Sequence, residues 1–385
     1  MVYLKKILGV LLLLHFSFSY CQANISLEVL DVETGKPIPN AKVIAPDNTV
    51  VYTNDEGKVY ILNNIKHINV SAPTYEELDF DLFETIIKLK PIYKDINEVQ
   101  INIIDTKPIF QNTLKDYPKL YYSKPSIYSG TIKQKAYMNN LINNLLVADV
   151  DIWSVANAYN FKAVNDINSF VQIGLNNIKY YRTKKNDADN FLNTDIQISP
   201  KNFMPKLFFN SMLVGLLNDT KDEKIASRLV YENNDIKIFT FEIKSKIIGN
   251  GKFIYNKNDR LITYFDIRTK GYEIKTNKSD KNGKEYISVS NNSYIVYDFY
   301  KNNNYYVPSL VKIEAGGYIL YKGKKIPINI IQEFGLTNFQ KTNKTEIKNR
   351  IDLDKNITDN IPSNDNNKSN STLLSEEEMQ FINER

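Results

Sequence analysis

The feature that most constrains the fold is a long succession of short β-prone runs separated by turn residues. Residues 25–32 alternate apolar and polar side chains, which is the period of a strand with one buried face. Farther along, Asn-rich turns at 233–235, 256–259 and 302–304 separate β-rich runs, and Asn accepts the positive φ that hairpin turns need. Strands that follow one another through such turns predict a mainly β protein built from antiparallel hairpins.

The first part of the chain, residues 22–103, is expected to form a small β-sandwich. Gly35 and Pro37 mark one of its turns, because glycine supplies positive φ and proline stops a strand ladder. Short strands with polar turns at this spacing are typical of sandwiches. The expected strands are 25–32, 41–45, 58–62, 67–71 and 85–89.

Motifs in this region resemble those of the carboxypeptidase regulatory-like domain. Residues 31–43 (DVETGKPIPNAKV) are similar to its opening strand–turn–strand, and residues 53–59 (TNDEGKV) are similar to its hairpin. Residues 71–76, 88–91 and 96–101 resemble its later segments, in the same order. The resemblance implies a seven-stranded, transthyretin-like sandwich.

The next region, about 106–340, resembles in part the envelope proteins of Bacteroidetes that carry this domain. Residues 130–134 and 147–153 match a strand pair of that region. The domain also accompanies some zinc carboxypeptidases, whose catalytic module needs two histidine ligands and a glutamate. The resemblance therefore implies a cell-envelope protein without carboxypeptidase activity, because the mature chain would hold one histidine, His67.

That histidine count depends on a secretory signal peptide, which we predict over residues 1–21. Lys5 and Lys6 precede an apolar run at 7–14, and small residues follow before cleavage at Gln22 or Asn24. The run is too short to span a membrane core, which needs about 20 residues. Cleavage removes His15 and the single cysteine, Cys21, and so excludes cysteine nucleophiles, disulfides and Cys/His zinc sites.

The charge balance excludes one further class of partner. The chain has 385 residues, with 49 Lys and Arg against 44 Asp and Glu, and a formal net charge of +5. A charge this small, spread along the chain, is no footprint for nucleic acid. No other stretch approaches the length of a transmembrane helix, so an exported protein without a transmembrane helix is expected, in the periplasm, at the outer membrane or at the cell surface.

The second domain, 104–345, is expected to be an antiparallel β-rich meander, either a curved sheet or a partial barrel, with a few helices. Its architecture resembles the folds that carry lipoproteins across the periplasm. Residues 203–217 predict one amphipathic helix within it. Residues 346–385 are poor in apolar side chains and are expected to be a disordered tail. Within that tail, Ser375 and Glu378 form a capping box that predicts a short helix.

Candidate catalytic chemistry is sparse. His67 begins a predicted strand without a serine or aspartate partner placed by any motif, and is expected to be an exposed or edge-strand residue. Asp149 and Asp151 share one face of a strand about 7 Å apart, a spacing that glycoside hydrolases use. Acids on the solvent face of a sheet are also common. We therefore assign no catalytic, metal or cofactor-binding residue.

Paired tyrosines are the candidate binding residues. Neighbouring side chains on a strand point to opposite faces, so one member of each pair is expected to be exposed, where it can contact a sugar or a protein. The candidates are Tyr121, Tyr122, Tyr180, Tyr181, Tyr305 and Tyr306.

The sequence therefore predicts a non-enzymatic, exported envelope adaptor that binds a protein, glycan or lipid. A secreted carboxylate-dependent hydrolase and a periplasmic lipid or lipoprotein carrier are the alternatives. A cleft with two carboxylates about 5–9 Å apart favours the hydrolase. A deep apolar cavity favours the carrier, and a flat aromatic patch favours the adaptor.

Overall fold

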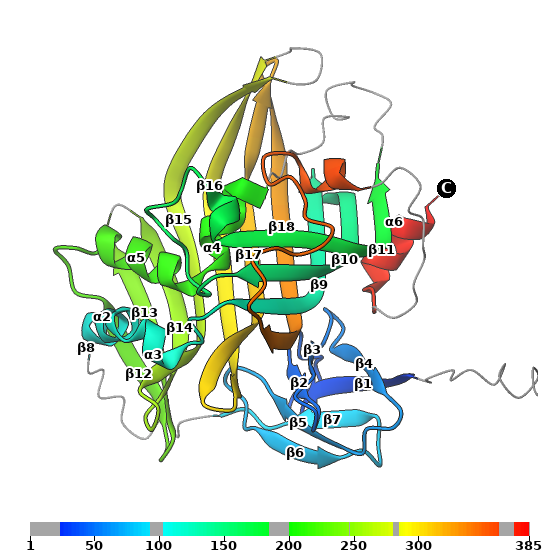
Figure 1. Ribbon diagram of the computed structural model, residues 1–385, viewed down its shortest axis with the longest axis vertical. Helices are drawn as coiled ribbons and strands as arrows, with labels where there is room; N and C mark the ends of the chain where they lie inside the picture. Colours follow the sequence, from blue (N-terminus) through cyan, green and yellow to red (C-terminus); the bar gives the residue numbers. More distant parts are fainter. Residues whose placement is uncertain are drawn as a thin grey trace, which may run out of the picture.

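The computed structural model describes residues 24–92, 103–184, 200–245, 247–279, 285–361 and 373–384. Over these residues the protein is mainly β, with three sheets and a few short helices (Figure 1). The predicted fold class is thus confirmed. The predicted signal peptide, 1–21, and the motif at 96–101 lie outside the described residues.

Residues 24–92 form a sandwich of seven strands in two sheets, the number that the sequence resemblance implies. Its core forms because alternate residues of each strand are apolar: in β1, Leu27 and Val29 are fully buried, and they pack against Val43 and Ile68 of the other sheet. One sheet has the order β4 (Lys58–Leu62), β1 (Asn24–Asp31), β7 (Ile86–Leu89). The other has the order β3 (Val50–Tyr52), β2 (Lys42–Ile44), β5 (His67–Ser71), β6 (Leu78–Asp81).

The rest of the chain is organised around one sheet of eleven strands, in the order β11-β10-β9-β18-β17-β16-β15-β14-β13-β12-β8, with β11 and β8 at its open edges. Every neighbouring pair is antiparallel. Of the two forms expected, the curved open sheet is the one observed. The strands are β8 (Ile104–Asp105), β9 (Ser126–Met138), β10 (Leu141–Ser154), β11 (Val171–Thr183), β12 (Ala226–Glu232), β13 (Ile236–Lys244), β14 (Ile248–Asn256), β15 (Leu261–Ser279), β16 (Glu285–Asn302), β17 (Tyr305–Tyr321) and β18 (Lys324–Lys341).

Asparagine makes several of the tight connections, as the sequence predicts. Asn140 joins β9 to β10 with φ 63°, and Asn303 joins β16 to β17 with φ 54°. Asparagine tolerates this left-handed conformation better than most residues. The last strand, β18, pairs with β17 on one side and with β9 on the other, and so joins the first strands of the region to the later meander in one sheet.

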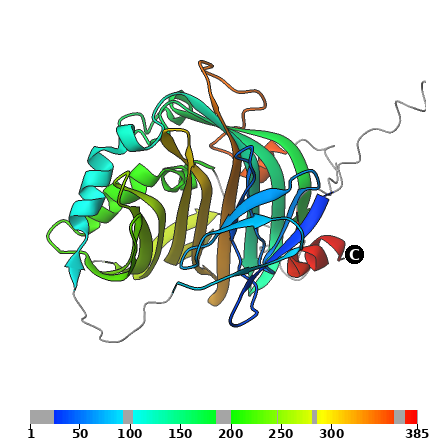
Figure 2. The same ribbon diagram turned by 90° about the horizontal axis from the view of Figure 1, so that it is seen from below.

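The helices and the sandwich cover opposite faces of this sheet (Figure 2). Along β16, Tyr297 and Phe299 contact Phe209 of a helix, whereas Asp298 between them binds the sandwich. We call these faces the helix face and the sandwich face. The helices are α2 (Lys107–Lys115), α3 (Tyr117–Leu120), α4 (Pro200–Leu207) and α5 (Phe209–Asp219), with 3-10 turns η1 (Ile167–Ser169) and η2 (Ile357–Asn360).

Two expectations differ from the structure. The helix predicted over 203–217 is divided into α4 and α5, because Phe208 between them is extended, with φ −111° and ψ 125°. The prediction of a disordered tail over 346–385 is wrong for residues 346–361 and 373–384, which are part of the folded structure. Residues 373–384 contain α6 (Glu376–Asn383), whose Phe381 is buried against β10. Few apolar residues suffice here because the neighbouring strands supply the rest of the cluster.

Candidate functional site

The sandwich is fixed to the large sheet by a buried polar network. Lys42 on β2 donates to Asp298 Oδ1 on β16 at 2.9 Å, and Tyr52 on β3 donates to Asp298 Oδ2 at 3.0 Å. The Tyr52 hydroxyl also lies 2.5 Å from Ser309 Oγ on β17. Burial and the neighbouring Asp298 raise the pKa of Tyr52 well above its ordinary value, so its hydroxyl stays a donor. This network fixes one side of the junction.

A second network fixes the other side through the C-terminal helix. Glu378 of α6 is fully buried, and its two carboxylate oxygens lie 3.0 Å from the ammonium groups of Lys133 and Lys135 on β9. Lys135 also lies 3.4 Å from Asp55, in the turn between β3 and β4. Burial alone would raise the pKa of Glu378, but Lys133 and Lys135 hold it below its ordinary value. Sheet, sandwich and tail helix therefore share one ion cluster.

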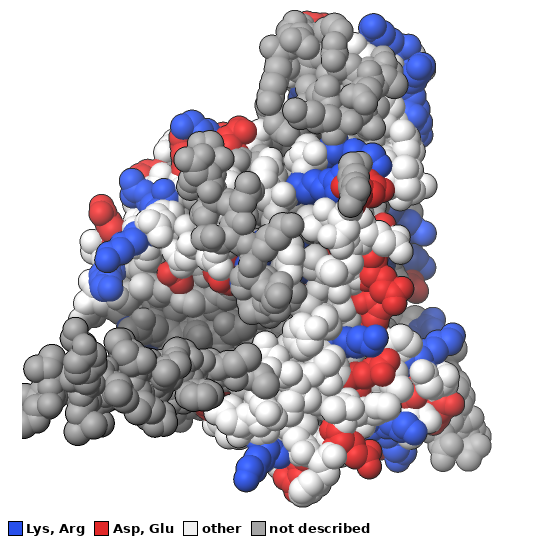
Figure 3. Space-filling view, turned by 90° about the vertical axis from the view of Figure 1, so that its right-hand side faces the viewer, with Lys and Arg blue, Asp and Glu red and all other residues white. Residues whose placement is uncertain are grey.

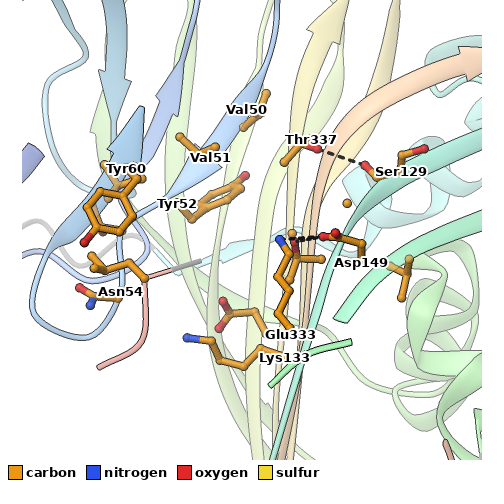
Figure 4. A pocket seen from close by; sticks show the side chains of 18 of the residues that line it. Val50, Val51, Tyr52, Asn54, Tyr60, Ser129, Lys133, Asp149, Glu333 and Thr337 are labelled. Carbon is orange, nitrogen blue, oxygen red and sulfur yellow. Dashed lines mark hydrogen bonds and ion pairs between the residues drawn. The ribbon is translucent and has the colours of Figure 1, made fainter. Parts of the chain in front are cut away.

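Between these two networks lies a cleft of about 450 Å³. Edge strands β3 and β4 of the sandwich form one wall, with Tyr52, Asn54 and Tyr60 (Figure 4). The sandwich faces of β9, β10, β11 and β18 form the other. Gly335 on β18 lies on the floor, where a Cβ atom would meet no other atom within 4 Å. The cleft thus has open space above Gly335.

The wall on the large sheet is polar and has three carboxylates. Asp149, Asp151 and Glu333 line the cleft together with Lys133 and Lys179. Hydroxyl and amide groups complete this wall. They belong to Ser129, Thr131, Asn176 and Thr337.

The carboxylates predicted as a candidate pair, Asp149 and Asp151, do lie in this cleft. Asp149 is 2.7 Å from the ammonium of Lys179. Asp151 accepts from Ser129 Oγ at 2.5 Å and from Asn176 Nδ2 at 2.8 Å. Each carboxylate is thus bound by neighbouring strands. These contacts fix the orientation of both carboxylates in the cleft.

The six predicted tyrosines do not form one exposed patch. Tyr121, Tyr122, Tyr305 and Tyr306 do come together, since Tyr121 bridges Tyr306 and the Tyr122 ring lies 5.3 Å from that of Tyr305. Tyr121, Tyr122 and Tyr306 are buried, and Tyr121 donates to the carbonyl of Ile262 at 2.7 Å. These residues therefore belong to the core, which is a correction to the predicted surface.

The third pair, Tyr180 and Tyr181, divides as strand alternation predicts. Tyr180 packs in the cluster beneath α6, and Tyr181 is 42% exposed. Tyr181 is thus the most exposed of the six, on the edge strand β11.

His67 is exposed in the structure, but its strand is not an edge strand, because β5 lies between β2 and β6 and pairs with both. It begins β5, and its Nδ1 lies 2.9 Å from Asp81 on the neighbouring strand β6. Within the described residues, no group of three or more His, Cys, Asp or Glu side chains could hold a metal ion.

The helix face of the large sheet is filled by aromatic side chains. Phe110 of α2 packs 5.0 Å from Phe253, and Phe209 of α5 packs 5.4 Å from Phe265. These rings belong to the main hydrophobic core. Core side chains therefore occupy the place where the lipid-carrier alternative expects an apolar cavity.

Sequence reasoning found two residues of the cleft, Asp149 and Asp151, and missed the others. Tyr52 and Tyr60 lie on strands that are far from these acids in the sequence, whereas Lys179 lies on the next strand, β11. The alternation of side chains along each strand could have indicated which face of that strand is exposed. Nothing local to those strands indicates that the two faces would meet.

Comparisons with known proteins place the chain in no family. No protein-family model and no curated protein matches it. A chain in "The complex structure of Pseudomonas aeruginosa MucA/MucB" aligns with 63% of this chain and 100% of its own length, at 7% identity and a TM-score of 0.22. A structural similarity this low supports no inference about fold or function. In the described part of the chain, no helix is long and apolar enough to cross a membrane.

Proposed function

We propose that this is an exported, non-enzymatic binding protein of the cell envelope, and that the cleft between the sandwich and the large sheet is its binding site. The export rests on the signal-like residues 1–21, and the envelope setting rests on the resemblance of residues 31–101 to the carboxypeptidase regulatory-like domain. The partner that we favour is another envelope protein, which makes the protein an adaptor.

The observation that carries this proposal is that two edge strands line a cleft whose walls are held together by buried polar networks. β3 and β4 are each the last strand of their sheet, and both line the cleft. An edge strand leaves backbone groups on its open side that can pair with an extended polypeptide. The cleft therefore suits an extended protein segment.

The bracing of the cleft supports the same function. Asp298 binds the sandwich on one side of the junction, and Glu378 links α6 to Lys133 and Lys135 on the other side. A site that is already held in shape costs less ordering free energy when its ligand binds.

The chemistry of the cleft supports a binding protein better than a hydrolase. Its acids, Asp149, Asp151 and Glu333, are balanced by Lys58, Lys133 and Lys179. Two of the acids have partners from neighbouring strands at 2.5–2.8 Å. Balanced, pre-oriented donors and acceptors suit recognition of an uncharged polar segment, such as a peptide backbone.

Photo-cross-linking in the native host tests the proposal. The photoreactive residue p-benzoylphenylalanine replaces Tyr60 in the cleft and, as a matched control, the exposed Tyr181. We expect illumination to attach one envelope protein reproducibly at position 60 and not at position 181, with identification by mass spectrometry. Adducts that are identical at both positions, or no adduct at position 60, would contradict the proposal.

A further inference from the structure

The distal halves of β15 to β18 project beyond the rest of the protein at one end of its long axis (Figure 1). This projection, which we call the wing, comprises residues 270–279, 285–292 and 316–328. Its strands pair in register almost to their tips: Ser279 opposes Glu285, and Tyr321 opposes Lys324. The wing is therefore an extension of the large sheet and is held in place by its ladder hydrogen bonds.

The wing is strongly basic. It has six lysines against two glutamates, Glu273 and Glu285, so its net charge of +4 exceeds the +3 that remains for the whole chain after residues 1–21. Figure 3 shows basic side chains along the outer edge of this end of the molecule. The six lysines are Lys270, Lys275, Lys278, Lys322, Lys324 and Lys325.

The opposite end of the long axis, which is the sandwich, is acidic (Figure 1). Residues 24–92 have eleven Asp and Glu against six Lys, a net charge of −5 with His67 neutral. Several of these acids lie at or beside the edge strand β6, where Asp79 and Asp81 have side chains 75% and 65% exposed. The molecule thus has a positive end and a negative end.

We propose that the wing binds the surface of an anionic phospholipid bilayer, with the acidic sandwich held away from that surface. Basic clusters are attracted to anionic headgroups, and the repelled acidic end makes one orientation favourable. Exposed aliphatic side chains among the lysines suit the boundary between headgroups and acyl chains. Ile274 is 61% exposed between Lys270 and Lys275.

This inference is independent of the cleft, because none of the wing residues lines it. The charge separation also suits a second copy of the chain, whose acidic sandwich could bind the basic wing. An apolar contribution from Ile274 favours the bilayer over that arrangement, because the opposing β6 edge of a second copy is acidic. Self-association is therefore the competing outcome of the test.

The test is vesicle co-sedimentation of the purified protein. Probes are phosphatidylcholine vesicles with or without about one third phosphatidylglycerol, at about 0.1 M and about 0.5 M salt. We expect binding only to the anionic vesicles and only at the lower salt. Replacing Lys322, Lys324 and Lys325 by Gln is expected to weaken that binding roughly 100-fold, at about fivefold per lysine.

The matched control replaces Lys36, Lys66 and Lys88, which are exposed on the sandwich, by Gln. It changes the net charge equally and is expected to leave vesicle binding unchanged or slightly stronger. Thermal unfolding by circular dichroism verifies that both variants fold. Three results would overturn the inference: no preference for anionic vesicles, equal losses in both variants, or an increase in mass at low salt without vesicles that the wing variant abolishes.

Discussion

Glu378 and Lys133 form an ion pair of 3.0 Å although 245 residues separate them in the chain. The pair joins the tail helix α6 to β9, and the same carboxylate also binds Lys135. Since Lys135 in turn lies near Asp55 of the sandwich, this one glutamate contributes to holding the wall of the cleft.

Replacing Glu378 by Gln is expected to lower the free energy of unfolding by about 3–5 kcal/mol, because it leaves two poorly exposed lysines without their buried counter-charge. Urea unfolding measures this change. Glu376→Gln, on the exposed side of the same helical turn, is the control, with an expected loss below about 1 kcal/mol. Equal losses in the two variants would mean that the buried ion cluster has no special role.

The same pair predicts a pH dependence. Burial alone would raise the pKa of Glu378, but Lys133 and Lys135 hold it below its ordinary value of 4.5. A carboxyl group with a lowered folded-state pKa stabilises the fold above its unfolded pKa, and that stabilisation is lost as the pH falls through the folded-state pKa.

The difference in unfolding free energy between the natural protein and Glu378→Gln should therefore be full at neutral pH and shrink below roughly pH 4. The pKa of Lys135, which Glu378 and Asp55 raise despite burial, adds no change in this window. Urea unfolding at several pH values measures the difference. A difference that stays constant from neutral to acidic pH would contradict the assignment.

Tyr52→Phe tests the network on the other side of the cleft. Removing the hydroxyl takes one hydrogen bond from each of Asp298 and Ser309, and we expect a loss of about 1–3 kcal/mol in the free energy of unfolding. Tyr181→Phe removes a hydroxyl from an exposed side chain and should cost less than about 0.5 kcal/mol. A loss from Tyr52→Phe no larger than this would show that the network does not brace the junction.

The sequence predicts the hairpins because turn chemistry and strand alternation are local properties. Asn303 with its positive φ lies in a turn that the residue types alone indicate. The capping box of Ser375 and Glu378 is likewise visible in four consecutive residues, and the structure confirms it. The burial of Glu378 is not predictable in this way, because it depends on lysines of β9 that are far away in the chain.

The same limit applies to the cleft and to the tyrosines. Alternation correctly places Asp149 and Asp151 on one face, but their partners Lys179 and Asn176 come from another strand. Tyr122 sits on a surface that Tyr305 and Phe339 then cover, so its exposure could not be judged locally. Contacts between distant segments decide which predicted surface remains open.

Gly335 allows the central claim, that the cleft is the binding site, to be tested by filling it. A Cβ atom at this position points into open space, so Gly335→Phe should fill the cleft while the free energy of unfolding changes by less than about 1 kcal/mol. Gly335→Ala, which adds one methyl group, is the control. Gly130 cannot serve instead, because a side chain there would collide with the carbonyl of Gly335.

The most direct measurement combines this variant with the photoreactive residue at position 60. We predict that Gly335→Phe reduces the yield of the partner adduct at least about tenfold, whereas Gly335→Ala retains most of it, since only the larger side chain excludes an extended segment from the cleft. An adduct yield that Gly335→Phe leaves unchanged, in a protein that is still folded, would contradict the assignment of the cleft as the binding site.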